Sequence, residues 1–181
     1  MENPVVLITG ALTGIGYATA LAFTHNGACI VVSGRHDEEG NALAQELRDL
    51  GGEAEFVRAD VRHDEEVQNL VDPVMGQKAA PGASVYAASK HAVEGMTKAA
   101  ALETASSGVR VNAVAPGPVE TGMLNRFTGS AERKASLIAG IPAQRAGTPD
   151  EVAQTILFLG SDKAPFLTGQ VIAVDGGKLA S

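Results

Sequence analysis

Short apolar runs alternate with segments of helical spacing along the first part of the chain. Apolar runs lie at 4–9 and 28–33, and a third strand is predicted at 53–58. Short runs with few interior polar positions are typical of parallel strands that are buried on both faces. The pattern therefore predicts strand, helix, strand, helix, strand, which is the order of a doubly wound α/β sheet.

The second predicted helix carries clear start and stop signals. Asp37 is its predicted N-cap, and Leu43, Leu47 and Leu50 share one face of it. The two glycines at 51–52 are expected to end it.

This alternation stops after Val71. The stretch 72–83 contains no apolar run that could form a core strand. A long helix is then predicted from about Ser84 to Ala105, with Gly108 as its stop. The elements predicted after it are a strand at 109–115, a loop with a short helical part at 116–127, helices at 131–140 and 148–161, and a last strand within 169–177.

The helix at 148–161 has the best-defined start in the chain. Thr148 is a favourable N-cap, Pro149 suits the first helical position, and Glu151 completes a capping box.

Composition narrows the class of protein. The 181 residues are 45% hydrophobic, which predicts one globular domain over 1–181. The net charge of −7 argues against nucleic acid and anionic membrane as partners, and no apolar run reaches the roughly 18 residues of a membrane span. Without a basic segment before the first apolar run, we expect no signal peptide and a cytoplasmic protein. Cys29, the only cysteine, is expected to be a small buried hydrophobe, and the four histidines show no metal-ligand spacing.

A glycine-rich turn, TGALTGIG at 9–16, joins the first strand to the first helix. Gly10, Gly14 and Gly16 allow a sharp turn and the close approach of a phosphate, while the helix N-terminus offers free N–H groups. A tight turn without a ligand is the alternative. Its position after the first buried strand of a βαβ unit favours dinucleotide binding.

The ends of the second and third strands should meet the adenosine part of such a ligand. Arg35 follows the second strand and suits the 2′-phosphate of NADP, whereas Asp37 nearby keeps NAD open. Asp60, after the third strand, could accept a hydrogen bond from the adenine amino group or cap the following helix.

Tyr86 and Lys90 lie four residues apart and therefore on one face of the long helix. A tyrosine with a pKa near 10 moves protons poorly at neutral pH, and a neighbouring ammonium lowers that pKa. Such a pair can transfer a hydroxyl proton while a nicotinamide transfers a hydride.

The motifs TGALTGIG, ADV, YAASK, VNAVAPGPVET and TGQVIAVDGG occur in this order from residue 5 to residue 177. Together they resemble the short-chain dehydrogenase/reductase family in its single-domain, Rossmann-like form. The resemblance implies Tyr86 as the acid/base and Lys90 as its helper. It also implies a set of cofactor-binding residues: Gly10, Thr13, Gly14, Ile15 and Gly16 at the pyrophosphate, Arg35, Asp60 and Val61 at the adenosine, and Pro116, Gly117, Val119 and Thr121 at the nicotinamide. Tyr86 and Lys90 belong to the cofactor-binding set as well, and Lys90 can form a hydrogen bond with the ribose of the cofactor. A homo-oligomer, a tetramer or a dimer, is implied in the same way.

The family comparison also implies that a segment is absent between about Val71 and Met75. The family places a fourth strand, a helix with a catalytic Asn and a fifth strand there, and a catalytic Ser stands thirteen positions before the tyrosine. This chain has Pro73 at that position. Three explanations compete: a segment missing from the sequence only, a true deletion that closes the sheet in the order 3-2-1-6-7, and a damaged gene product.

Two functions follow from these residues. The first is an NAD(P)-dependent oxidoreductase acting on a small secondary alcohol or ketone, with NADP favoured over NAD. The second is a cofactor-binding or assembly protein without catalysis, because the Ser and Asn of the family are missing. The segment 123–127 could act as an apolar lid over the substrate or pack as an ordinary helix.

Overall fold

The computed structural model describes residues 4–58 and 84–180, with side chains from Lys90 onward in the second range. The contacts within the chain divide it into two compact units, Met1–Val67 and Gln68–Ser181, and each is described by itself. The prediction of one domain over 1–181 stays a prediction.

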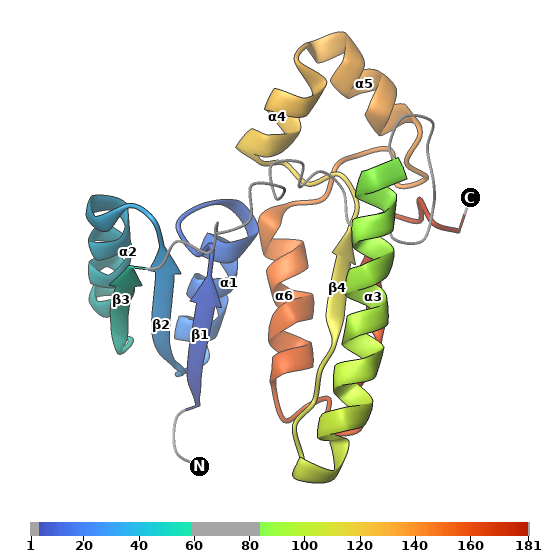
Figure 1. The fold of residues 1–181 in the computed structure, drawn as a ribbon. Coiled ribbons are helices and arrows are strands. Elements are labelled where there is room, and N and C mark those ends of the chain that lie inside the picture. Colours follow the sequence, from blue (N-terminus) through green and yellow to red (C-terminus); the bar gives the residue numbers. More distant parts are fainter. Residues whose placement is uncertain (1–3, 59–83, 181) are drawn as a thin grey trace. The chain divides into compact units, whose positions relative to one another are not determined.

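The first unit is a parallel three-stranded sheet with two helices (Figure 1). Its elements are β1 (Val5–Thr9), α1 (Gly14–His25), β2 (Cys29–Gly34), α2 (Asp37–Asp49) and β3 (Ala54–Arg58). The strand order is β1-β2-β3 and both pairs are parallel. The Rossmann-like α/β prediction is confirmed here, because each strand returns through a helix to a parallel neighbour.

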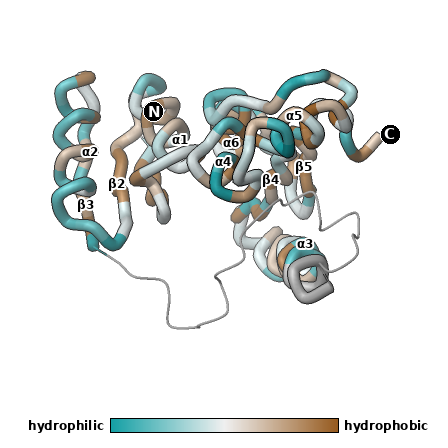
Figure 2. The backbone as a smooth tube through the Cα atoms, turned by 90° about the horizontal axis from the view of Figure 1, so that it is seen from above, coloured by the Kyte–Doolittle hydropathy of each residue, from teal (hydrophilic) through white to brown (hydrophobic). Residues whose placement is uncertain are grey.

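Both helices of this unit pack on one face of its sheet (Figures 1 and 2). Ile8, Ile30 and Val32 point to this face and are buried, as are Leu43 and Leu47 of α2. Apolar burial of this kind contributes roughly 25 cal/mol per Å² to stability.

The opposite face of β1 differs from the prediction. Val5 is 74% exposed and Leu7 is 64% exposed, although a strand buried on both faces was expected. Side chains alternate along a strand, so these two residues point away from the face that α1 and α2 cover. Among the described residues of this unit, no helix lies on that second face.

Three smaller predictions for this unit are wrong. The N-cap of α2 is His36, and Asp37 is the first residue of the helix. Leu50 lies past the end of α2 and is 48% exposed, so it does not share the buried face of Leu43. Cys29 is half-exposed, and its Sγ donates a hydrogen bond to Glu53 Oε2 at 3.4 Å, which raises the pKa of the thiol.

The second unit is built on a parallel pair of strands. Its elements are α3 (Ser84–Thr104), a 3₁₀ turn (Ala105–Ser107), β4 (Ala113–Pro116), α4 (Gly122–Thr128), α5 (Ala131–Ala139), α6 (Pro149–Gly160) and β5 (Val171–Val174). Helices α3 and α6 lie on opposite faces of the β4-β5 pair (Figure 2). The described strands form two sheets, one in each unit, with the orders β1-β2-β3 and β4-β5.

Strand β4 begins later than the predicted 109. Arg110 donates hydrogen bonds to the main-chain carbonyls of Leu159 and Ser161, at 2.7 and 3.1 Å, and Asn112 donates to Leu167 at 2.8 Å. These side chains bind the end of α6 and the loop between α6 and β5, and the Val111 carbonyl accepts a hydrogen bond from the Gly169 amide at 2.7 Å. Residues 109–112 are therefore held against this loop before β4 begins.

The predicted capping box of α6 is confirmed. Thr148 Oγ1 accepts a hydrogen bond from the Glu151 amide at 3.3 Å, and Glu151 Oε2 accepts one from the Thr148 amide at 2.8 Å. Pro149 is the first residue of the helix.

Candidate functional site

The glycine-rich turn has the conformation that its sequence requires. Gly10 has φ 67° and Gly14 has φ 58°, values that favour glycine because a Cβ would meet the backbone. A Cβ on Gly16 would overlap the carbonyl oxygen of Gly10, so the first turn of α1 lies directly against the end of β1. Glycine at position 16 is therefore required by close packing and not only by flexibility.

The N-terminus of α1 is open to an anion. Its N-cap, Thr13, makes no side-chain hydrogen bond to the helix, and the first turn contains no acidic residue. The first amides of a helix have no partner within it and carry a partial positive charge. The diphosphate of a dinucleotide fits this site, since it would bring the acceptors and the negative charge that the chain itself does not supply.

The turn is attached to the end of β2. The Ala11 amide donates a hydrogen bond to the Ser33 carbonyl at 3.3 Å. The side chain of Leu12 lies over Gly34, where a Cβ would come within 2.6 Å of Leu12 Cδ1. The structure thus brings the glycine-rich turn next to the segment that begins with Arg35, as a dinucleotide site requires.

Arg35 is exposed just after β2. The structure adds a second cation that the sequence reasoning missed. Arg58, the last residue of β3, donates a hydrogen bond from Nε to the Arg35 carbonyl at 3.4 Å and lies 3.8 Å from Asp37. The sequence contains a signal for this residue. Arg58 ends the third predicted strand, which is expected to lie beside the strand that ends before Arg35. Asp60 and Val61 lie outside the described residues.

Tyr86 and Lys90 both lie in α3, one helical turn apart. Lys90 is half-buried. The side chain of Tyr86 and the position of Pro73 lie outside what the structure describes. The helical spacing of the predicted acid/base pair is therefore present.

The residues expected at the nicotinamide lie together in the second unit. Pro116 ends β4, and the Gly117 amide donates a hydrogen bond to the Val174 carbonyl at 2.9 Å. A Cβ on Gly117 would come within 2.8 Å of Asp175 Cα, so this glycine allows two chain segments to touch. Thr121 is the N-cap of α4, and its Oγ1 accepts a hydrogen bond from the Leu124 amide at 3.4 Å.

Helices α4 and α5 form an insertion between β4 and α6 (Figure 1), and the chain segments at its two ends are hydrogen-bonded to each other. The Glu120 amide donates to the Gly147 carbonyl at 2.8 Å, and the Gly147 amide donates to the Pro118 carbonyl at 2.9 Å. Lys134 of α5 reaches back to Glu120, with Nζ 2.6 Å from Oε2, and to Asn125 at 3.1 Å.

The apolar side chains of α4 divide between its two faces. Leu124 is buried, whereas Met123 and Phe127 are 44% and 57% exposed. Leu124 packs as in an ordinary helix, and the proposed role of the other two residues as a cover over the substrate stays a prediction.

The described residues contain no group of three or more His, Cys, Asp or Glu side chains that could hold a metal ion. Among the helices that the structure describes, none is long and apolar enough to cross a membrane.

Two family descriptions match the chain. Residues 4–77 match the family described as short chain dehydrogenase, and residues 72–178 match the one described as Enoyl-(Acyl carrier protein) reductase. The chain belongs to the short-chain dehydrogenase/reductase family. The two matches meet at 72–77, close to the segment 71–75 where the absent part of the chain was predicted.

Curated relatives agree with this membership. The chain is 31% identical to the 3-oxoacyl-[acyl-carrier-protein] reductase FabG of Thermotoga maritima over 243 residues, covering 98% of each chain. It is 30% identical to the cyclohexanol dehydrogenase of an Acinetobacter species, covering 97% of this chain and 94% of that one. The first alignment spans 243 positions against the 181 residues of this chain, so part of that relative has no counterpart here.

A solved structure described as a candidate NAD(P)-dependent gluconate 5-dehydrogenase of Beutenbergia cavernae, with bound NADP, has a TM-score of 0.83 and 31% identity. The match covers 98% of this chain and 97% of that one. The predicted function is thereby confirmed in its general form. The protein is an NAD(P)-dependent oxidoreductase that acts on a small alcohol or ketone, and catalysis is favoured over binding alone.

Proposed function

We propose that Tyr86 is the acid/base of this oxidoreductase and that Lys90 lowers the pKa of its hydroxyl. The cofactor, when bound, gives or takes the hydride. In ketone reduction the Tyr86 hydroxyl donates its proton to the carbonyl oxygen, and in alcohol oxidation the phenolate takes it back. The placement of both residues one turn apart on α3 supports this pair, since an ammonium at that distance favours the phenolate.

The cofactor is proposed to lie along the residues predicted from the sequence. Gly10, Thr13, Gly14, Ile15 and Gly16 would hold the diphosphate, Arg35, Asp60 and Val61 the adenosine end, and Pro116, Gly117, Val119 and Thr121 the nicotinamide end. The observation that carries this proposal is the start of α1, which has neither a side-chain cap nor an acidic residue in its first turn.

NADP is the proposed cofactor rather than NAD. Arg35 is exposed at the end of β2, where a guanidinium can form paired hydrogen bonds with a 2′-phosphate. The relative from Beutenbergia cavernae was solved with NADP. Replacing Arg35 by Asp should weaken NADPH binding far more than NADH binding, and equal effects on both would contradict the phosphate role.

We also propose a homo-oligomer, a dimer or a tetramer, in the cytoplasm. The long helix α3 exposes Val93, Met96 and Leu102, at 44%, 61% and 83%. Val93 and Met96 lie about one helical turn apart, and neighbouring exposed apolar side chains of this size can contribute to an interface between subunits. Light scattering should give a mass above that of one chain, and Met96→Glu should reduce it.

The test of the proposed reaction uses Tyr86→Phe and Lys90→Ala with a panel of secondary alcohols and ketones. Phenylalanine keeps the ring and removes only the hydroxyl. Tyr86→Phe should lower kcat by about 10²- to 10⁴-fold. NADPH affinity should change by less than about twofold, because the diphosphate site is intact.

Turnover that survives in Tyr86→Phe would contradict the assigned role. An intact mass separates the explanations for position 73. A mass well above 18.5 kDa indicates a segment that contains the missing Ser, whereas 18.5 kDa with cofactor binding and no turnover on the panel supports a binding protein.

A further inference from the structure

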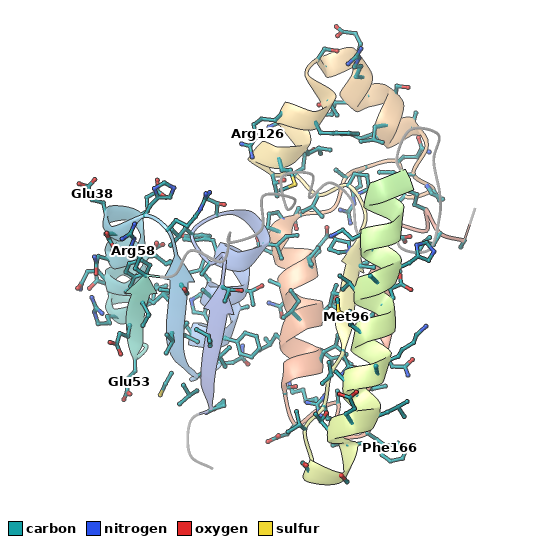
Figure 3. The ribbon with its side chains drawn as sticks, viewed as in Figure 1. Glu38, Glu53, Arg58, Met96, Arg126 and Phe166 are labelled. Atoms are coloured by element: carbon teal, nitrogen blue, oxygen red, sulfur yellow. The ribbon has the colours of Figure 1, made fainter. Side chains whose placement is uncertain are left out.

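The end of β3 contacts the loop that carries Arg35. In the parallel register, Arg58 at the end of β3 is paired with Gly34 at the end of β2. The Nε atom of Arg58 donates a hydrogen bond to the Arg35 carbonyl at 3.4 Å and lies 3.8 Å from Asp37 Oδ2. Figure 3 shows Arg58 at the end of β3, beside α2. One guanidinium therefore contacts both the backbone of the loop and the first carboxylate of α2.

Asp37 is the first residue of α2 and lies two residues after Arg35, close to where the choice between NAD and NADP would be made. A carboxylate at the end of the second strand accepts hydrogen bonds from a ribose 2′-OH and repels a 2′-phosphate. Asp37 is followed by Glu38 and Glu39, so the start of α2 carries three acidic residues. An unpaired Asp37 would therefore oppose the positive charge that Arg35 offers to a phosphate.

The ion pair is too exposed to matter much for folding. The side chains of Arg58 and Asp37 are 66% and 62% exposed, and exposed pairs contribute little to stability. The same pair can matter for a ligand, because a bound 2′-phosphate would be a close neighbour of both charges.

We propose that Arg58 is a specificity-determining residue for the cofactor. It fixes the loop of residues 35–37 through the Arg35 carbonyl and neutralises Asp37, so that the end of β2 accepts a 2′-phosphate. This inference rests on the proposed NADP site. The inference adds Arg58 of β3 to the residues that select the cofactor. It also assigns Asp37 as a group that would favour NAD if it were not paired with Arg58.

The test measures dissociation constants of NADPH and NADH by cofactor fluorescence. The variants are Arg58→Ala, Asp37→Asn and the two combined. Arg58→Ala should weaken NADPH binding at least about tenfold, since the hydrogen bond to the Arg35 carbonyl is lost and the Asp37 carboxylate loses its ion pair. NADH binding should change by less than about twofold or become tighter. Adding Asp37→Asn should restore most of the NADPH affinity.

Arg48→Ala is the matched control. Arg48 lies on α2 and also donates to a main-chain carbonyl, that of Ala54 at 2.7 Å, at the opposite end of β3. It should leave the ratio of the two affinities unchanged.

Each other outcome decides against the inference. If Arg58→Ala changes the affinities for NADPH and NADH equally, or changes neither, the specificity role of Arg58 is overturned. A failure of Asp37→Asn to restore NADPH binding overturns the neutralisation of Asp37. A wild-type protein that binds neither dinucleotide overturns the proposed function and this inference with it, so the two failures are distinguishable.

Discussion

Two helices of twelve residues, α1 and α6, begin in opposite ways. Side chains of the chain itself cap the start of α6. Thr148 and Glu151 form a capping box, and Arg145 Nη1 donates a hydrogen bond to Glu151 Oε2 at 2.8 Å. The start of α1 has an N-cap threonine that caps nothing and no acid in its first turn. The amides at the start of α6 receive acceptors from side chains of the chain, whereas those at the start of α1 are left for the proposed ligand.

The largest effect is expected from closing the space at the start of α1. A side chain in Gly16→Val would overlap the Gly10 carbonyl oxygen. The backbone must shift, so unfolding free energy should fall by about 1–3 kcal/mol and NADPH binding should be lost. Calorimetry and cofactor titration measure the two effects. Gly140→Ala is the control, because its methyl would lie 3.5 Å from the Leu137 carbonyl, an ordinary contact.

A charge at the same helix start should separate stability from function. Thr13→Asp supplies the missing cap and complements the helix dipole, which should stabilise the ligand-free protein by about 0.5–1 kcal/mol. The new carboxylate would repel the diphosphate and weaken NADPH binding at least about tenfold. Thr13→Asn caps without charge. If both variants lowered affinity equally, repulsion would not be the cause.

Removing the cap of α6 should have a smaller and purely structural effect. Thr148→Ala leaves the Glu151 amide without its acceptor and should cost about 1 kcal/mol in urea unfolding. Cofactor affinity should not change. A loss of affinity as large as that of Gly16→Val would erase the contrast between the two helix starts.

The smallest effect is the pH dependence of the α6 start. Hydrogen bonds from Arg145 and then from the Thr148 backbone lower the pKa of Glu151 from 4.5 to about 2. Because the folded pKa is below the unfolded one, this stabilisation is present above pH 4.5 and is lost as the pH falls toward 2. Glu151→Gln should flatten the acid limb of the stability curve in that window. An unchanged limb would mean that other carboxylates determine it.

Most of the local structure could be predicted. The hydrophobic pattern predicts β1, β2 and β3 to within one or two residues, and the sequence also predicts the residues of the α6 capping box. The predictions failed where a contact with a distant segment decides the outcome. Arg110 and Asn112, which precede the start of β4, donate to carbonyls more than forty positions further along the chain.

The same division holds for the candidate site. The glycine-rich turn and the Tyr86–Lys90 spacing follow from residues close together in sequence. Arg58 was missed, because its relation to Arg35 and Asp37 depends on the register of β2 with β3. The backbone hydrogen bonds that join Pro118 and Glu120 to Gly147 were missed for the same reason.

The sequence by itself determined the alternation of strands and helices, the open start of α1 and the closed start of α6. Each of these depends on side chains within one helical turn or one strand, where spacing fixes which groups meet. Only the tertiary structure decided that Val5 and Leu7 face outward, that Cys29 binds Glu53, and that Arg58 meets Asp37. These contacts join separate strands and helices, and pairing register and packing, rather than local pattern, set such distances.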